Sequence, residues 1–397
     1  MQKSFLQMLL FHRAAGASLA TTLSASVFSA PLLMAYFGML SLVGPMANLL
    51  TGWAVTWCFR GSLLTAAAGC VLPGPARVLG WIVAWGFRYV VLVAEHLARL
   101  PFAALYARSG YVLGWVALCY GLGLLQWSTP EQQRRYPIVL CCLLLGLTAS
   151  IGFSQLEDAG TVGAVLDVGQ GQCLCLRSKE RTILVDCGGS KGEKTGDIAA
   201  DYLASLGENR VDILLLTHYA SDHVNGVAEL LRRTEVGLVL LPDDQPENGL
   251  REPLISAAES AGVEVRLLDS DADVTLGPWK MTVCAGQGDG NDGGLSVLLE
   301  AGDLRFLVTG DLDAEAEWRL LRTHELPQVD VLVAGHHGAK DSTSDALLEA
   351  VRPRVVAVSV GQNSYGHPAE ETIARIEARG VAVCRTDQQG TLRIKGA

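Results

Sequence analysis

One segment sets the fold of this chain: Asp212-Ile213-Leu214-Leu215-Leu216-Thr217-His218-Tyr219-Ala220-Ser221-Asp222-His223-Val224-Asn225-Gly226. Its apolar run predicts a buried strand, and two imidazoles and a carboxylate follow in the turn after it. A loop at the end of a rigid strand can aim short side chains at one point. His218, Asp222 and His223 are nitrogen and oxygen donors, which favour Zn, Mn or Fe. The segment therefore predicts a metal site; the alternative is a strand and a helix start with incidental histidines.

The composition indicates two halves of different character. The chain has 397 residues, enough for two or three domains, and half of them are hydrophobic while 18% are charged. Up to Leu156 there are nine lysines and arginines against two acidic residues, Glu95 and Glu131. The remainder holds 22 basic and 39 acidic residues, a net charge of about −17. An apolar, slightly basic half thus precedes an acidic half of soluble character.

The ten cysteines predict neither a zinc ribbon nor a disulfide framework. None of them has the Cys-x-x-Cys spacing of zinc ribbons and thioredoxin-like sites. Cys173 and Cys175 are two residues apart and fall on one face of a predicted strand, where we expect them in the core.

Apolar segments of membrane-crossing character dominate the first half. Met1–Gly16 is basic and amphipathic and lacks a small-residue cleavage signature, so a removed signal peptide is not predicted. The shorter piece Leu63–Leu72 lies between Arg60 and a Pro-Gly-Pro sequence, and we interpret it as re-entrant or as a half-helix. The predicted spans are Ala17–Gly38, Leu42–Phe59, Val78–Ala94, Tyr111–Leu125 and Ile138–Phe153.

Basic loops give these spans an orientation. Arg60 and the pair Arg134-Arg135 are best placed in the cytoplasm, which puts the acidic half on the extracytoplasmic side. Arg99 and Arg108 then lie outside as well, which counts against this topology.

The predicted metal segment resembles a family motif. Residues 217–226 read Thr-His-x-x-x-Asp-His-x-x-Gly, which resembles the second motif of the metallo-β-lactamase superfamily, written His-x-His-x-Asp-His. Where that family places its second ligand, a His or an Asp, this chain has Ala220. A methyl group cannot bind a metal, so one ligand of the first metal position is missing. The gap bears on catalysis more than on the fold.

Further motifs follow in the order seen in the ComEC family of DNA-uptake proteins. Ser41-Leu42-Val43-Gly44-Pro45-Met46-Ala47-Asn48-Leu49-Leu50 resembles part of the competence domain of that family. Leu166-Asp167-Val168-Gly169-Gln170-Gly171 and Ile183-Leu184-Val185-Asp186-Cys187-Gly188-Gly189 look like the opening strands of its lactamase-like domain. The resemblance covers Val162 to Ile394 and extends over Ala17–Phe153. The chain resembles a C-terminal portion of the longer family members.

The resemblance implies metal ligands on separate strand ends. Asp222 and His223 would serve the second metal and His218 the first. Asp311, at the end of an apolar strand, would bridge the two, because two close cations need a shared anion. His336, in the doublet between Gly335 and Gly338, is the expected ligand of the second metal. The implied cofactor is one or two divalent ions, Zn or Mn.

Other residues of the matching motifs receive supporting roles. Gly335-His336-His337-Gly338-Ala339-Lys340 resembles His-His-Gly-Ser-Lys: His337 is a candidate for orientation or phosphate contact, and Lys340 either neutralises a phosphate oxygen or is solvated. His367, in Tyr-Gly-His-Pro, would act as general acid to the leaving oxygen or stabilise charge on it. The expected catalytic residues are Asp222, His367 and Lys340.

Three polar residues are expected near the site without binding metal. We interpret Asp167 and Asp186, each at the end of a strand, as loop-fixing carboxylates rather than ligands. Asn291 lies in the loop where the family has an Asn-rich sequence, and would contact the substrate or a metal ligand.

The resemblance also implies the architecture. Residues 1–156 would form a partial competence-type domain of membrane helices. Residues 157–397 would form an α/β metallo-β-lactamase domain, a four-layer αβ/βα sandwich in which two mixed sheets face each other with helices outside. The metal site would lie at one rim of the sandwich.

The expected function is that of a multi-pass cell-membrane protein of DNA uptake in natural transformation. Its lactamase-like domain would act as a metal-dependent phosphodiesterase or nuclease on incoming DNA. DNA and the membrane are therefore the expected partners, together with further copies of the chain and other DNA-uptake proteins.

A rival hypothesis comes from Ala220, which stands where the family has a metal ligand. The domain would then be a catalytically weakened module with a structural or docking role on a DNA-conducting channel. The acidity of the second half gives DNA binding no independent support, because nucleic-acid binders usually carry a basic footprint.

Overall fold

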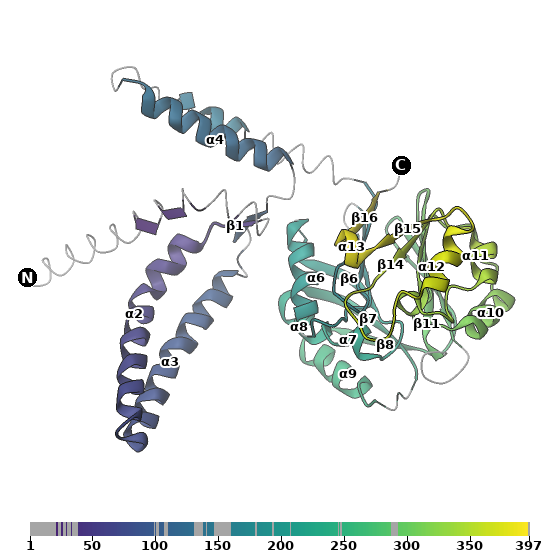
Figure 1. Ribbon diagram of the computed structural model, residues 1–397, viewed down its shortest axis with the longest axis horizontal. Helices are drawn as coiled ribbons and strands as arrows, with labels where there is room; N and C mark the ends of the chain where they lie inside the picture. Colours follow the sequence, from purple (N-terminus) through teal and green to yellow (C-terminus); the bar gives the residue numbers. More distant parts are fainter. Residues whose placement is uncertain are drawn as a thin grey trace, which may run out of the picture. The chain divides into compact units, whose positions relative to one another are not determined.

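The protein is described from a computed structural model, which divides into two compact units, Met1–Gln155 and Leu156–Ala397 (Figure 1). We call them the first and the second unit and describe each by itself. The described residues are 21–22, 25–26, 29, 33, 39–98, 100, 103–106, 110–130, 138–139, 141–146, 160–178, 181–192, 194–206, 208–244, 246, 248–286 and 293–395.

The first unit contains a long helical hairpin. Its helices are α2 (Gly44–Gly69) and α3 (Pro73–Ala98), which lie side by side (Figure 1). Proline is tolerated in the first turn of α2, where no intrahelical N–H bond is lost. The helices approach closely because Gly86 has no side chain: an added Cβ would lie 2.4 Å from the Cys58 sulfur.

The piece Leu63–Leu72 is not separate from the helix before it, contrary to the prediction. Helix α2 continues without a break through Arg60 as far as Gly69, and the turn to α3 follows directly. A single Arg-Gly pair costs a helix about 1 kcal/mol and does not end it. The Pro-Gly-Pro sequence that follows does impose a boundary, since α3 begins at Pro73.

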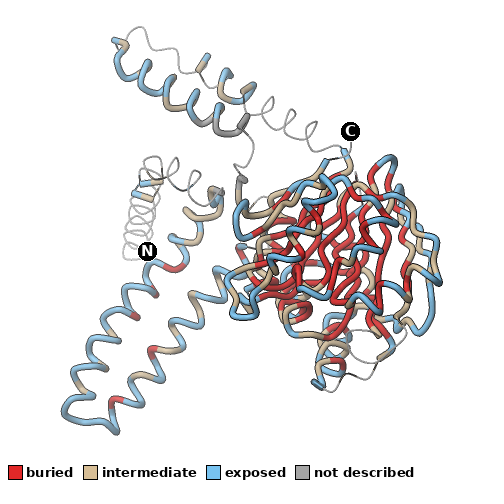
Figure 2. The backbone as a smooth tube through the Cα atoms, turned by 45° about the vertical axis from the view of Figure 1, so that its right-hand side comes forward, coloured by how far each residue is buried: buried red, intermediate tan, exposed pale blue. Residues whose placement is uncertain are grey.

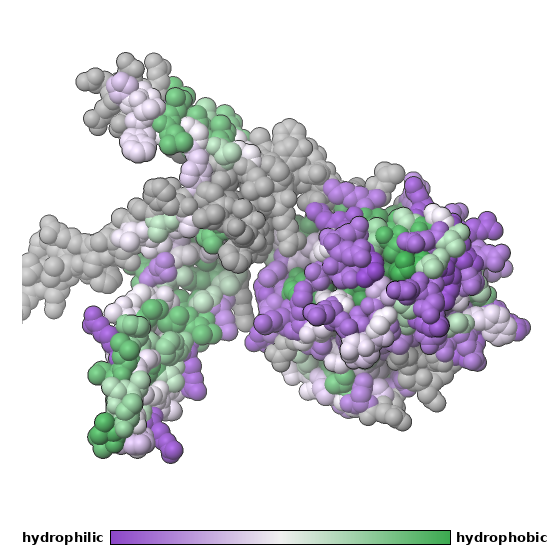
Figure 3. Space-filling model, viewed as in Figure 1, coloured by the Kyte–Doolittle hydropathy of each residue, from purple (hydrophilic) through white to green (hydrophobic). Residues whose placement is uncertain are grey.

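The surface of the hairpin is apolar. Figure 2 shows that most of its backbone is exposed, and Figure 3 shows apolar side chains covering it. Among the described residues one helix, Pro73–Ala98, is long and apolar enough to cross a bilayer by length and composition. Most of the predicted span Ala17–Gly38 and half of the predicted span Ile138–Phe153 lie outside the described residues.

The remaining described elements of the first unit are short. Strand β1 (Met39–Ser41) pairs antiparallel with β2 (Ala104–Tyr106). Helix α4 (Gly110–Ser128) follows, and the indole N–H of its Trp115 donates a hydrogen bond of 2.8 Å to the Leu143 carbonyl.

The second unit contains two seven-stranded mixed sheets. The first has the order β16-β3-β4-β5-β6-β7-β8, and its strands from β5 to β8 run parallel. Its strands are β3 (Val162–Val165), β4 (Leu174–Ser178), β5 (Arg181–Val185), β6 (Arg210–Leu215), β7 (Glu235–Pro242), β8 (Glu264–Leu268) and β16 (Leu392–Lys395). The central strands are near-continuous runs of Val, Ile and Leu, as expected for strands buried on both faces.

The second sheet has the order β15-β14-β13-β12-β11-β10-β9 and is parallel from β12 to β15. Its strands are β9 (Ala272–Leu276), β10 (Trp279–Ala285), β11 (Leu295–Ala301), β12 (Leu304–Val308), β13 (Val331–Val333), β14 (Val355–Val358) and β15 (Ala382–Arg385).

The two sheets share one apolar core, to which both contribute inward-facing side chains such as Leu215 and Phe306. A second core lies under the helices of the first sheet, α6 (Lys194–Ser205), α8 (Val227–Arg233) and α9 (Arg251–Ser260). A third lies under the helices of the second sheet, α11 (Asp345–Val351) and α12 (Glu370–Glu377), and α10 (Ala314–Thr323) covers a smaller cluster. Helices therefore flank two facing sheets, which confirms the predicted αβ/βα sandwich (Figures 1 and 2).

Gly163 lies where the two sheets pack tightly against each other. An added Cβ on this residue of β3 would lie 2.1 Å from the ring of Phe306, which β12 of the other sheet holds fully buried. A larger side chain must therefore displace a ring that has no room to move.

We expect Gly163→Val to destabilise the second unit by about 1–3 kcal/mol, the usual cost of overpacking a core. The measurement is the thermal unfolding midpoint of the full chain. The matched control is Gly160→Val just ahead of β3, where an added Cβ meets no described atom within 4 Å. Equal midpoints for the two variants would contradict this packing.

Candidate metal centre

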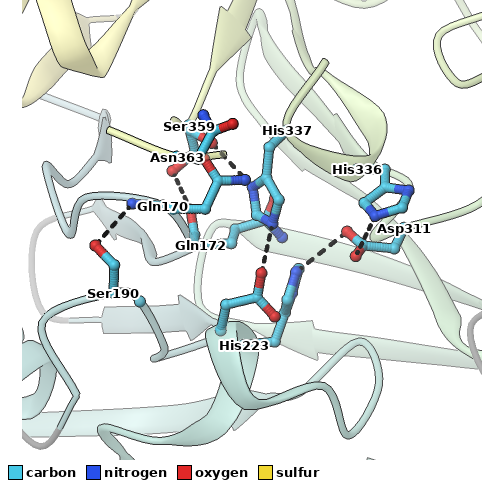
Figure 4. A network of polar contacts seen from close by, with 12 residues as sticks. Gln170, Gln172, Ser190, His223, Asp311, His336, His337, Ser359 and Asn363 are labelled. Atoms are coloured by element: carbon cyan, nitrogen blue, oxygen red, sulfur yellow. Dashed lines mark hydrogen bonds and ion pairs between the residues drawn. The ribbon is translucent and has the colours of Figure 1, made fainter. Parts of the chain in front are cut away.

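Histidines and carboxylates from both sheets meet at one rim of the sandwich. His218 follows β6, and the short helix α7 (Ser221–Val224) carries Asp222 and His223. Asp311 follows β12, and the turn Gly335–Gly338 after β13 carries two more histidines. These parallel strands end at the same edge, which is why residues far apart in sequence come together (Figure 4).

Asp311 lies at the middle of this group and is buried. Its Oδ2 is 3.5 Å from the Nε2 of His218 and 3.7 Å from the Nε2 of His336, while its Oδ1 is 3.1 Å from the Nε2 of His223. Burial raises the pKa of Asp311, but attraction to His223 and His218 outweighs burial and holds that pKa well below its ordinary value. The carboxylate therefore stays ionised and faces imidazoles on two sides.

His223 is fixed between two carboxylates. Its Nδ1 lies 2.8 Å from Asp186, so this nitrogen carries the proton of the neutral ring and Nε2 is left towards Asp311. Burial lowers the pKa of His223, whereas Asp311 and Asp186 outweigh burial and raise it well above the ordinary value. The ring has one orientation available, with Nε2 aimed at the centre.

Asp186 holds this arrangement in place. It is fully buried, has a left-handed backbone with φ of 60°, and accepts hydrogen bonds from the Thr217 N–H, the Thr217 hydroxyl and the Gln172 amide at 2.7–2.8 Å. The next turn also needs glycine, since a Cβ on Gly188 would lie 2.4 Å from the His223 backbone. Asp186 thus has the geometry of the loop-fixing carboxylate expected from the sequence.

The structure places His337, rather than His336, beside Asp222. The Nε2 of His337 is 3.2 Å from the Asp222 carboxylate, and its Nδ1 lies 2.9 Å from the Ser359 carbonyl, which accepts the ring proton. Ser359 is itself tied by its hydroxyl to the Gly171 carbonyl at 2.6 Å. The buried His337 ring is therefore oriented in the same way as that of His223, with Nδ1 held by an oxygen acceptor and Nε2 directed at a carboxylate.

The side chains of the His336-His337 doublet point in different directions because the backbone of both residues is left-handed. His336 and His337 have φ angles of 47° and 55°, a conformation that costs non-glycine residues about 1–3 kcal/mol. The two rings consequently leave the turn in different directions. His337 enters the protein, and His336 stays 38% exposed near Asp311. Such strain at a turn with two glycines is typical of functional sites.

Buried polar atoms around this centre lack hydrogen bonds. Among the described residues these are His218 Nε2, His223 Nε2, Asp311 Oδ1 and His337 Nε2. Their nearest polar neighbours are ion-pair contacts with one another, 3.1 Å between Asp311 Oδ1 and His223 Nε2 and 3.2 Å between His337 Nε2 and the Asp222 carboxylate. Two overlapping groups have all their ligand atoms within 4.8 Å of one another: His218, His223 and Asp311; and Asp222, His223 and His337. This donor set fits a divalent ion such as Zn or Mn.

Several other predicted residues lie away from these groups. Lys340 is exposed and pairs with Glu371 at 2.8 Å, so it is not directed at the centre. Asp167 accepts from the Gly169 N–H and lies 3.6 Å from Lys191, as a loop-fixing carboxylate on the surface. Asn291 lies outside the described residues. Ala220 is the N-cap residue of α7 and offers no side-chain cap.

His367 lies at the edge of the centre. Its ring centroid is 5.2 Å from that of His336, and its Nδ1 is buried without a hydrogen bond among the described residues. Burial first, and the neighbouring His336 and His337 next, lower the pKa of His367. The neutral ring is therefore favoured.

A cleft of about 610 Å³ opens beside Asp222. Most of its lining side chains are amides and hydroxyls. The sequence analysis did not single out these residues, because such side chains are common in loops. Their position next to the matched Gly-x-Gly and Tyr-Gly-His-Pro motifs could have identified them as lining residues of the site. The lining residues are Gln170, Gly189, Ser190, Ser221, Asp222, Asn225, Gln362, Asn363, Ser364 and Tyr365.

Comparison with known proteins identifies two families along the chain. Residues 166–362 match the metallo-β-lactamase superfamily, and residues 2–131 match the competence protein family. The competence protein ComA of Neisseria gonorrhoeae is 30% identical over 386 residues, which cover 93% of this chain and 50% of that protein. ComE operon protein 3 of Bacillus subtilis is 25% identical over 279 residues, 64% of this chain and 35% of that protein.

A third relative is recombination protein 2 of Haemophilus influenzae, 28% identical over 65% of this chain and 31% of that protein. The chain thus spans half the length or less of these curated relatives. Among solved structures, the metallo-β-lactamase fold protein YhfI of Bacillus subtilis matches 60% of this chain and all of its own, with 11% identity and a TM-score of 0.44. Zn²⁺-bound PqqB of Methylobacterium extorquens matches 59% of this chain, with 11% identity and a TM-score of 0.42.

The contacts of Asp186 predict its effect on metal binding. Asp186→Asn removes the charge that fixes the His223 ring, and such changes behind a ligand weaken metal affinity about 10–100-fold. The affinity of the full chain for Mn²⁺ is measured by competition with a chromophoric chelator. Asp167→Asn, which alters the exposed strand-end carboxylate, is the control and should bind as the wild type does. An unchanged affinity of Asp186→Asn would refute this role.

The two histidines of the doublet predict different losses. His337→Ala removes one of the three donors in the group of Asp222, His223 and His337. It should weaken Mn²⁺ binding at this group by about 100-fold or more, a larger loss than for a residue that only orients a ligand. His336→Ala leaves that group complete and should spare the site. Calorimetric titration of both variants distinguishes them, and the reverse order of losses would show that His336 is the ligand.

Proposed function

This chain belongs to the ComEC family of competence proteins, and we propose that it acts in DNA uptake, with its second unit serving as a metal-dependent phosphodiesterase. One observation carries the proposal: buried imidazole and carboxylate atoms without hydrogen bonds converge beside an open cleft. These atoms have only one another as ion-pair partners, at 3.1–3.5 Å, and a divalent ion would satisfy the buried nitrogens and oxygens together. The substrate in this proposal is DNA.

Asp311 would divide the ligands into two sets. Its Oδ2 faces His218 and His336, and its Oδ1 faces His223, which lies with Asp222 and His337 in the second set. An imidazole nitrogen has one lone pair, so His223 can serve a single ion. A divalent ion bound there, Zn or Mn, would supply Lewis-acid stabilisation of charge on a phosphoryl group.

The chain's own groups would orient this chemistry. Asp186 and the Ser359 carbonyl hold the protons of His223 and His337 on Nδ1, which leaves each Nε2 able to bind. His367 is placed to hydrogen-bond to a leaving oxygen, since its unpartnered Nδ1 lies next to the His336 ring.

The first unit would form the membrane part of the molecule. Its helical hairpin exposes large apolar side chains on both helices, including Trp53, Trp81 and Phe87. Water-exposed surface of this kind is rare in soluble proteins and is expected against lipid or other membrane helices. In this proposal residues 1–156 are a multi-pass segment of the cell membrane, residues 157–397 lie on the extracytoplasmic side, and further copies or other uptake proteins bind the assembly.

A second candidate function is a catalytically weakened module that docks on a DNA channel. Ala220 favours it, because the first ligand set lacks a donor where the superfamily has one. The surface pairing of Lys340 with Glu371 also favours it, since no lysine then neutralises a phosphate from this turn. The second ligand set does not depend on either residue, which keeps the enzyme as the preferred proposal.

The decisive experiment measures metal content and hydrolysis together on the full chain. We expect near-stoichiometric Mn or Zn and hydrolysis of labelled DNA in the wild type. Asp311→Asn should lower activity by about 100-fold or more, since it removes a charged ligand and not merely a residue behind one. His324→Ala, whose ring pairs with Asp271 away from the centre, is the control.

The outcomes separate the two functions. Activity lost in Asp311→Asn and kept in His324→Ala supports the phosphodiesterase. A wild type without metal and without hydrolysis, yet folded, supports the docking module instead.

A further inference from the structure

The cleft beside Asp222 is built from neutral groups. Among its described lining residues Asp222 carries the only charge, and the others offer amides, hydroxyls and backbone groups. Its volume of about 610 Å³ is that of a pocket for a small ligand rather than of an extended groove. Figure 4 shows Gln170, Ser190 and Asn363 on the side of His337 that lies away from His336 and Asp311.

One of the residues that line the cleft, Tyr365, is aromatic. Tyr365 is 75% exposed, and its ring centroid is 6.0 Å from that of His367, which adjoins the metal centre. Its loop is held by Asn363, whose Oδ1 accepts the N–H groups of residues 365–367 at 3.0–3.1 Å and whose amide donates to two carbonyls. The exposed ring is therefore presented by a fixed loop.

These features favour an unpaired nucleotide over a duplex. Proteins that hold duplex DNA gain affinity by neutralising phosphates with lysine and arginine, and the described cleft lining has neither. Stacking on an aromatic ring is a different source of affinity, worth about 5- to 150-fold per base, and it needs no positive charge. A base that is paired in a duplex is already stacked and is not available to the ring.

Resting on the proposed function, we propose that Tyr365 is the stacking platform for one base and that the cleft binds a single-stranded segment of DNA. The base would lie on the Tyr365 ring, with amides and hydroxyls of the cleft around the sugar. The adjoining phosphodiester would then reach the metal centre past Asp222. Specificity for single strands follows from the ring and the neutral walls.

The test uses the full chain purified in detergent, with a chelator present so that no hydrolysis occurs. Fluorescence anisotropy gives the affinity for labelled oligothymidylate, for an abasic oligomer of equal length and for an oligothymidylate–oligoadenylate duplex. Tyr365→Ala should weaken oligothymidylate binding about 5- to 150-fold, whereas Tyr365→Phe keeps the ring and the affinity. The abasic oligomer should bind weakly and equally to all variants, and the duplex should bind less well than the single strand.

The exposed Trp318 on α10 is the matched control ring. Trp318→Ala should bind oligothymidylate as the wild type does, and unchanged unfolding midpoints show that all variants fold. Wild-type affinity in Tyr365→Ala, tighter binding of the duplex, or no binding of any probe overturns the inference. The proposed function is decided separately by metal content and by the Asp311→Asn assay, so either can fail alone.

Discussion

Buried carboxylates at strand ends need positive or hydrogen-bonding partners, and this requirement organises the second unit. Asp186 and Asp311 both lie inside the protein, on opposite sides of His223. Asp186 accepts hydrogen bonds from Thr217 and Gln172, in loops next to the strands of its own sheet, whereas Asp311, which follows the other sheet, has only ion-pair contacts with imidazole nitrogens. One carboxylate thus completes the fold and the other leaves it incomplete in a way that a cation would correct.

The sequence was sufficient for the architecture and for part of the centre. Apolar strands that end in short polar side chains identify His218 and Asp311, since the strand fixes the direction in which its end points. The choice between His336 and His337 could not be made from a doublet between glycines, because it depends on a left-handed turn that spacing does not reveal. Lys340 could not be placed either, as its partner Glu371 lies on a later helix. In the first unit, Arg60 suggested a break that helix continuity overrides.

The negative charge of the second unit is compatible with the proposed function if DNA binding and phosphodiester hydrolysis depend on different groups. A unit with about 17 net negative charges cannot attract DNA over a long distance. Short-range contacts have to supply binding instead: a neutral cleft avoids adding repulsion, and an exposed ring offers stacking. In the proposed reaction the positive charge is needed only at the phosphodiester, and cations held by Asp311 and its neighbours would provide it there. An acidic domain and a polyanionic substrate are compatible on these terms.

The gap at Ala220 affects the two ligand sets unequally. The set of Asp222, His223 and His337 has its rings oriented by Asp186 and Ser359, and it draws nothing from position 220. The other set retains His218, with His336 on the same oxygen of Asp311, but His336 is partly exposed and no described hydrogen bond fixes its ring. In the proposed centre, an ion at the first position would therefore bind more weakly and exchange faster than one at the preorganised second position, because orientation by groups behind a ligand determines much of its affinity. The loss of one ligand therefore makes the centre asymmetric without dismantling it.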